Sequence, residues 1–103
     1  LIERYPVHEV SDEALLAIAR CHLELGQAET ALVTFRRVAP HLDEDDAVRA
    51  HQVMARGLER LGRYEAAASI HARLADLAPE GSSARREALR RLDALSEGVP
   101  ARR

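Results

Sequence analysis

Apolar side chains recur every three or four residues through most of this chain, which is the spacing of an amphipathic helix. Leu15, Ile18 and Leu25 are a typical run. No stretch sustains the strict alternation of a strand. The pattern therefore predicts an all-α protein. The expected helices span about 12–25, 28–39, 47–61, 64–78 and 82–97.

Residues that start and stop helices support this division. Ser11, followed by two acidic residues, predicts a capped helix start, since its hydroxyl can accept a backbone N–H bond. Gly26 and Gly62 can adopt the left-handed conformation that ends a helix. Pro40 and the acidic run 43–46 are expected to break the second helix. The short connections predict antiparallel neighbours.

The chain also repeats itself. Nine positions between 14–41 and 50–77 are identical at an offset of 36 residues, where an alanine-rich chain would match by chance at roughly two or three. A second echo, 34 residues further on, relates the third helix to the fifth. Such periods indicate stacked supersecondary units. The predicted units are the end of a preceding repeat or a linker (1–11), a repeat (12–45), a second repeat (46–81), a capping helix (82–97) and a disordered tail (98–103).

The repeated small residues predict how each hairpin closes. Ala31 and Ala67 fall where the two helices of a pair should lie closest. Phe35 and Tyr64 are the bulky side chains available to fill an otherwise Leu/Ala core. Cys21, the only cysteine, lies in an apolar run and is expected to be buried.

The spacing of these residues matches a known pattern. The first copy offers Leu15, Ile18, Ala19 and His22, then Ala31 and Phe35; the second offers His51, Met54, Ala55 and Leu58, then Ala67, His71 and Pro79. In this the chain resembles the tetratricopeptide repeat family, whose signature is W-x2-L-G-x2-Y, then A-x3-F, then proline. It departs from the signature in lacking Trp and in having Ala19 and Ala55 in place of glycine. The resemblance implies a right-handed α-α superhelix of two hairpins plus a C-terminal capping helix, in a bacterial, non-enzymatic protein-binding scaffold.

In that family the binding groove is lined by the first helix of each hairpin. The resemblance implies these groove residues: Leu16, Arg20, Leu23, Arg49, Gln52, Arg56, Arg60, Arg86 and Arg90. Arg20, Arg56 and Arg90 occupy equivalent positions and would form a ladder. Guanidinium groups bind carboxylates through paired hydrogen bonds, so the expected partner is an acidic or amphipathic peptide. The alternative is that these arginines pair with acidic residues along their own helices.

Charge is distributed unevenly along the chain. Residues 1–46 carry four Arg against ten acidic residues, whereas 82–103 carry six Arg against three. This polarity leaves open a second function, head-to-tail self-association. A third is a regulatory domain within a larger transcription factor or enzyme. The Arg cluster at 85–91 is the main feature favouring nucleic-acid binding, which the net charge and scarce aromatics disfavour.

Other classes of site find no support in the sequence. The five histidines show no metal-ligand spacing, and no Ser, His and acid residues form an ordered constellation, so no metal, cofactor or catalytic site is expected. His22 and His71 are expected to be packed and hydrogen-bonded. Without Lys or Asn, the chain lacks the clamp that related proteins use to hold chaperone C-termini. No apolar run is long enough for a membrane span. The chain begins at Leu1 without Met and is expected to be a fragment, cytoplasmic by default or periplasmic if its parent carries a signal.

Overall fold

The computed structural model describes residues 11–98, and these residues are helical with no strand among them. The all-α prediction is therefore confirmed. Of the expected units 1–11 and 98–103, all but Ser11 and Gly98 lies outside the described residues. The elements are α1 (Asp12–Glu24), α2 (Ala28–Val38), the short 3-10 helix η2 (Ala39–His41), α3 (Glu44–Arg60), α4 (Tyr64–Leu77) and α5 (Ser83–Gly98).

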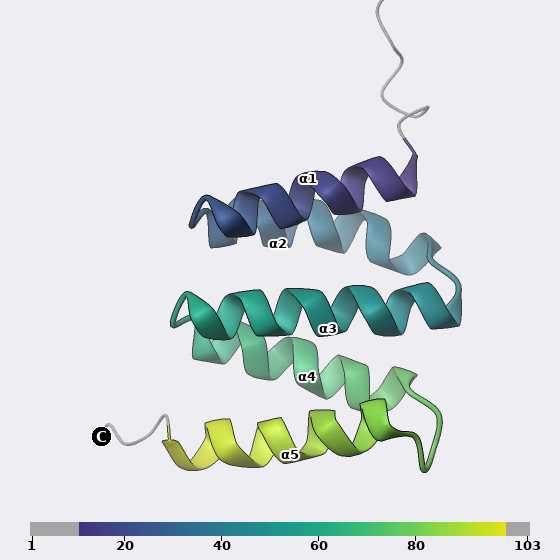
Figure 1. The fold of residues 1–103 in the computed structure, drawn as a ribbon, viewed down its shortest axis with the longest axis vertical. Helices are drawn as coiled ribbons and strands as arrows, with labels where there is room; N and C mark the ends of the chain where they lie inside the picture. Colours follow the sequence, from purple (N-terminus) through teal and green to yellow (C-terminus); the bar gives the residue numbers. More distant parts are fainter. Residues whose placement is uncertain (1–10, 99–103) are drawn as a thin grey trace, which may run out of the picture.

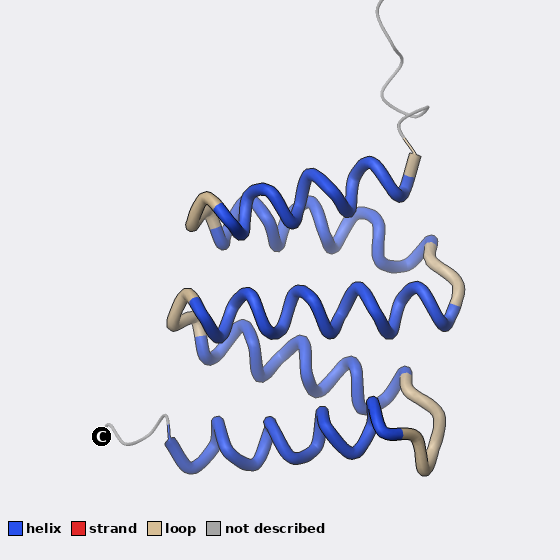
Figure 2. Tube along the Cα trace, viewed as in Figure 1, coloured by secondary structure: helices blue, strands red, loops and turns tan. Residues whose placement is uncertain are grey.

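The helices stack in two layers (Figure 1). Helices α1, α3 and α5 form the nearer layer and run in the same direction, while α2 and α4 lie behind them and run back. Helix α1 packs against α2 and α3, and α4 packs against both α3 and α5. The tight turns lie at one edge of the stack and the longer connections at the other (Figure 2). All three first helices of the predicted units therefore share one layer.

Local chemistry explains where the helices begin and end. The Ser11 hydroxyl accepts a hydrogen bond from the Ala14 N–H at 3.0 Å, which caps α1 as predicted. Gly26 and Gly62 have φ values of 81° and 76° and stop α1 and α3 in the left-handed conformation, as predicted. A side chain at either position would be strained because L residues rarely adopt this conformation.

The start of α3 differs from the prediction. The acidic run 43–46 is predicted to lie between the second and third helices, yet α3 begins at Glu44, three residues before the predicted Ala47. The Asp43 carboxylate accepts a hydrogen bond from the Asp46 N–H at 2.9 Å and caps the helix. Acidic side chains are favourable in a first helical turn, so the same run initiates a helix. The predicted repeat boundary between residues 45 and 46 thus falls inside α3.

The core follows the repeated small residues. Ala19, Ala31, Ala55 and Ala67 are all buried, together with Phe35, and lie in one apolar cluster. Close packing at these positions confirms that the alanines permit the helices to approach. Tyr64 was expected to fill the core, but it is the first residue of α4 and is 45% exposed. That prediction is wrong.

The outer face of α1 is exposed where its counterpart in α3 is covered. Ile18 is 43% exposed, whereas Met54, 36 residues later, is 2% exposed because α1 lies over it. Cys21 is exposed as well, so the expectation of a buried cysteine is wrong. Its counterpart is Gly57, which is buried against Leu23 of α1. The side of α1 that carries Cys21 has no equivalent helix above it among the described residues.

Candidate functional site

A hollow of about 690 Å³ lies between α1 and α3, next to the connection from α2 to α3. The apolar residues that line it are Leu16, Ala19, Leu42, Ala50, Val53 and Met54. Most of them lie on successive turns of the two parallel helices, so the hollow runs along both. Its volume lies within the range of sites that bind small molecules or peptide side chains.

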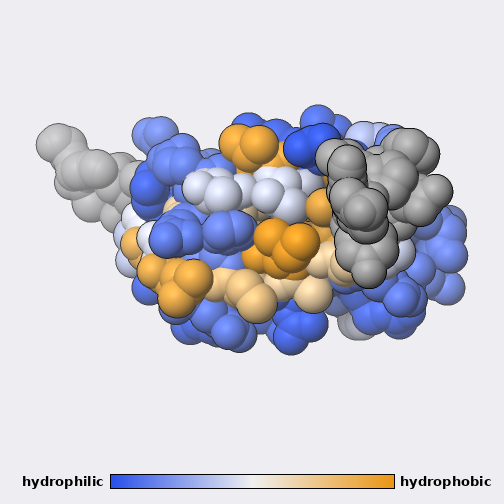
Figure 3. All heavy atoms as spheres, turned by 90° about the horizontal axis from the view of Figure 1, so that it is seen from above, coloured by the Kyte–Doolittle hydropathy of each residue, from blue (hydrophilic) through white to orange (hydrophobic). Residues whose placement is uncertain are grey.

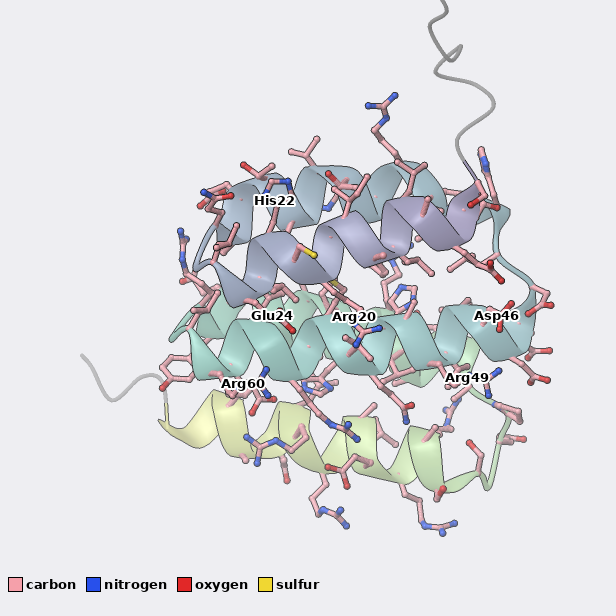
Figure 4. The ribbon with its side chains drawn as sticks, turned by 45° about the horizontal axis from the view of Figure 1, so that its top comes forward. Arg20, His22, Glu24, Asp46, Arg49 and Arg60 are labelled. Atoms are coloured by element: carbon pink, nitrogen blue, oxygen red, sulfur yellow. The ribbon has the colours of Figure 1, made fainter. Side chains whose placement is uncertain are left out.

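Charged side chains surround this apolar floor. Asp12 and Glu13 contribute from the start of α1, and Asp43 and Asp46 from the start of α3. The basic residues that line the hollow are Arg20 and Arg49. Arg20 extends from α1 on the side that faces α3, and Asp46 and Arg49 lie near the beginning of α3 (Figure 4). Carboxylates thus outnumber guanidinium groups in the lining, and they gather at the end where both helices start.

Arg20 and Arg49 differ in what they contact. The Arg49 guanidinium lies 3.2 Å from the Asp46 carboxylate, one turn earlier on α3. Among residues 11–96, no carboxylate forms an ion pair with Arg20. Arg20 is exposed and lines the hollow, so its guanidinium is available to a partner.

The other residues implied by the resemblance are dispersed. Gln52 and Arg56 line a much smaller hollow, about 50 Å³, that also includes residues of α4 and α5. Arg60 is exposed near the end of α3 (Figure 4). Leu23 is 7% exposed and packs onto Gly57, so it does not line the hollow between α1 and α3. Of the nine expected groove residues, the larger hollow brings together Leu16, Arg20 and Arg49.

The basic cluster of α5 is engaged within the protein. Arg85 donates to the Ala75 carbonyl at 2.8 Å, and Arg86 donates to the Gly81 carbonyl at 2.7 Å. Arg90 pairs with Glu87, and Arg91 pairs with Glu59. Arg90 therefore has a partner on its own helix, as the alternative interpretation of the arginine ladder expected. All four guanidinium groups satisfy part of their hydrogen-bonding capacity internally.

A hydrogen-bonded triad of Glu59, His71 and Arg91 joins α3, α4 and α5. The His71 Nε2 lies 2.7 Å from the Glu59 Oε2, and the Arg91 Nε lies 3.3 Å from the same oxygen. Burial alone would raise the pKa of Glu59, but the hydrogen bonds from Arg91 and His71 outweigh it and hold that pKa below its ordinary value. The carboxylate beside Arg91 in turn raises the pKa of that guanidinium. The contact thus favours the ionised forms of the Glu59 carboxylate and the Arg91 guanidinium.

The sequence did not single out this triad, although it carried a signal. Glu59 and His71 stand 36 residues after Leu23 and Phe35, two apolar core positions. The simultaneous replacement of both by ionisable residues indicates a paired site. His71 is buried and hydrogen-bonded, as expected, although its Nδ1 has no partner among the described residues. His22 Nδ1 lies 2.6 Å from the Gln27 Oε1, so it too is hydrogen-bonded.

A second hollow, about 510 Å³, lies on the side of α2 and α4 and includes buried His51. The His51 Nδ1 lies 2.7 Å from the Ala47 carbonyl oxygen and therefore carries the proton that it donates. Its ring meets Phe35 edge-on, with centroids 4.9 Å apart. Burial lowers the pKa of His51, and the charge of Arg73 lowers it further, although the bond to Ala47 opposes them.

Residues 11–98 contain neither a metal-binding cluster nor a membrane-spanning helix. No group of three or more His, Cys, Asp or Glu side chains in this part of the chain is arranged to hold a metal ion. None of the helices between residues 11 and 98 has the length and apolarity that a bilayer crossing requires.

Comparison with known proteins found no relative from which a function could be inferred. Neither the protein-family models, nor the curated proteins, nor the solved structures contain a match to this chain.

Proposed function

We propose that this chain is a non-enzymatic protein-binding module that docks an amphipathic segment in the hollow between α1 and α3. The observation that carries the proposal is the combination of an apolar floor with the Arg20 guanidinium, which pairs with no described carboxylate. An apolar groove with a few placed charges is the usual form of a peptide-docking surface. The two-layer stack of helical hairpins, the 36-residue period and the signature residues support a tetratricopeptide-like fold for the module.

The charge of the lining favours an amphipathic partner over a uniformly acidic one. Four carboxylates and two guanidinium groups line the hollow. A polyacidic segment would meet Asp12 and Glu13 at one end, where like charges disfavour binding. An apolar side chain can instead occupy the floor formed by Leu16 and Val53 while its charged neighbours meet the rim.

A displayed library of random dodecapeptides tests this proposal. The purified chain should enrich peptides whose binding is lost in Val53→Glu, because a carboxylate would then lie in the apolar floor. Val53 is 38% exposed, so the substitution does not disrupt the core. Val33→Glu is the matched control, since Val33 is a still more exposed valine on α2 and lies outside the hollow. Failure to enrich any peptide that distinguishes these two variants would overturn the proposal.

Self-association is a second candidate function, favoured by the outer face of α1 and α2, which no described helix covers. Ile18 is exposed there, and Leu25 and Val33 are further exposed hydrophobic residues of the same hairpin. Figure 3 looks down on this face and shows hydrophobic patches among the polar atoms. The equivalent face of α3 is already a contact surface within the chain, because α1 covers it. A second copy of the chain would bury it. Light scattering should then report a mass that rises with concentration and returns to the monomer in Ile18→Glu; a monomer at every concentration would exclude this candidate.

A further inference from the structure

The order of charges along the hollow specifies the kind of segment that fits it. Building on the proposed function, we infer that the bound segment places a basic residue beside Glu13, an apolar residue over Leu16 and an acidic residue beside Arg20. The partner is thus a peptide in which an apolar residue separates a basic from an acidic side chain. This order is a property of the hollow as a whole, whose apolar floor and opposed charges belong to one continuous surface.

The three residues of α1 lie on one face of the helix. Glu13, Leu16 and Arg20 stand at positions i, i+3 and i+7, which repeat on the same side of an α-helix, and all three line the hollow. The opposite wall also runs from a carboxylate to an apolar residue, from Asp46 to Val53, seven residues apart, and Arg49 between them is ion-paired with Asp46. Because α1 and α3 run parallel, the acidic ends of both walls coincide. The hollow therefore changes from acidic to apolar along both walls, and on α1 the series ends with a basic residue.

At each end of the hollow, charged side chains have no ion-pair partner among the described residues and can meet a bound segment. Asp43 accepts the capping hydrogen bond of α3, and Asp46 pairs with Arg49. Asp12 and Glu13, by contrast, form no ion pair with any described side chain of residues 11–96, and neither does Arg20. A partner with complementary ends would neutralise both without displacing an existing contact. Complementary charge of this kind fixes the direction in which a segment lies.

The distance between the two ends sets the spacing in the partner. Seven residues of α-helix rise about 10 Å from Glu13 to Arg20. An extended chain advances about 3.3 Å per residue, so its basic and acidic side chains would be about three positions apart. The apolar side chain lies between them, over the floor next to Leu16. A helical partner would need about seven positions for the same distance.

Selection from the same random library on two forms of the protein tests this order. Peptides enriched on the natural chain should carry a basic and an acidic residue about three or seven positions apart around an apolar one, in a consistent direction. On the exchange variant Glu13→Arg with Arg20→Glu, the selected order should reverse, because the two ends of the hollow have swapped charge. Peptides from the natural chain should bind this variant about tenfold or more weakly.

The control variant exchanges the same charges elsewhere. Glu29→Arg with Arg36→Glu swaps two exposed residues on α2, also seven positions apart, and leaves net charge unchanged. It should select the same peptides as the natural chain. Enriched peptides without a consistent charge order, or with an order that stays the same on the exchange variant, would overturn the inference and leave the proposed function standing. If no enriched peptide loses binding in Val53→Glu, both the inference and the proposed function are overturned. Far-UV circular dichroism confirms that each variant keeps its helices.

Discussion

Leu23 of α1 packs directly onto the backbone of α3 at Gly57. A Cβ atom at Gly57 would lie 2.7 Å from the Leu23 Cδ1, a separation too short for two carbon atoms. The lack of a side chain at Gly57 therefore leaves the space against α3 that the Leu23 side chain occupies. Leu23 is consequently a structural contact between the two hairpins.

The corresponding contact between α3 and α5 is an ion pair in place of an apolar contact. We call the α1–α3 contact the apolar joint and the α3–α5 contact the charged joint. Glu59 stands 36 residues after Leu23, and Arg91 stands 34 residues after Gly57. These two side chains form an ion pair between α3 and α5, with His71 on the same carboxylate. An apolar contact thus connects the first two units, and a hydrogen-bonded charged contact connects the second unit to α5. The two joints should respond differently to mutation and pH.

Replacing Gly57 with alanine tests the apolar joint. Alanine improves helix propensity by about 1 kcal/mol, but the added methyl group overpacks the contact with Leu23 at a cost of about 1–3 kcal/mol. We expect Gly57→Ala to lower the free energy of unfolding by about 1 kcal/mol in urea denaturation. Leu23→Ala should cost about 2–3 kcal/mol by itself, since it leaves a cavity. In the double variant the clash disappears, so additive costs would contradict the proposed contact.

The charged joint should weaken in acid. The folded state holds the pKa of Glu59 below its ordinary value, so the unfolded state binds the proton more readily. The stabilisation is complete above about pH 4.5 and is lost as pH falls through the folded pKa. Urea denaturation between about pH 7 and pH 3 should show a smaller loss of stability in Glu59→Gln than in the natural chain. Glu29→Gln, which removes an exposed pair with Arg63, serves as the control and should keep the natural slope.

His51 should contribute a separate pH dependence nearer neutrality. Burial lowers its pKa in the folded state, so the unfolded chain takes up a proton first and stability falls as pH drops below about 6.5. The equivalent residue in the first unit is Leu15, which suggests His51→Leu as a variant without the titrating group. We expect it to remove the change in stability between about pH 7 and pH 5. An NMR titration that finds the imidazole pKa at or above 6.5 would contradict this interpretation.

Cys21 should react readily in the folded protein. Its side chain is exposed on the outer face of α1, so a maleimide reagent should reach the thiol without unfolding. We expect the labelling rate in the native state to lie within about tenfold of the rate in denaturant. Mass spectrometry gives both rates, and Cys21→Ser shows the background. Much slower labelling of the native chain would mean that another surface covers this face, as self-association would require.

Local signals accounted for most of the predictable structure. Ser11, Gly26 and Gly62 act through their own backbone neighbours, so the sequence located the helix ends that they form. The start of α3 was misplaced because an acidic run fits both a loop and a first helical turn, and only the Asp43 hydrogen bond distinguishes them. Cys21 was misjudged because its burial depends on whether another helix covers α1.

The site was less accessible to prediction because it depends on helix rotation. Arg90 and Arg91 differ by one position, or about 100° around α5, and this turns Arg91 towards Glu59 while Arg90 pairs with Glu87. Spacing alone assigned Arg90 to the groove. Leu16 and Arg20 line the hollow, but the carboxylates beside them come partly from α3. Their meeting depends on tertiary packing, which no single helix encodes.

The two ends of the stack differ in the side chains that they would present to an added helical hairpin. Leu16 and Leu23 lie on the side of α1 that faces α3, and the residues 70 positions later on α5 are Arg86 and Asp93. A further hairpin added beyond α5 would have to bury these charges, whereas one added above α1 would meet Ile18 and Cys21. An engineered array built from this unit should therefore be extended from the α1 end, with α5 kept as its terminus.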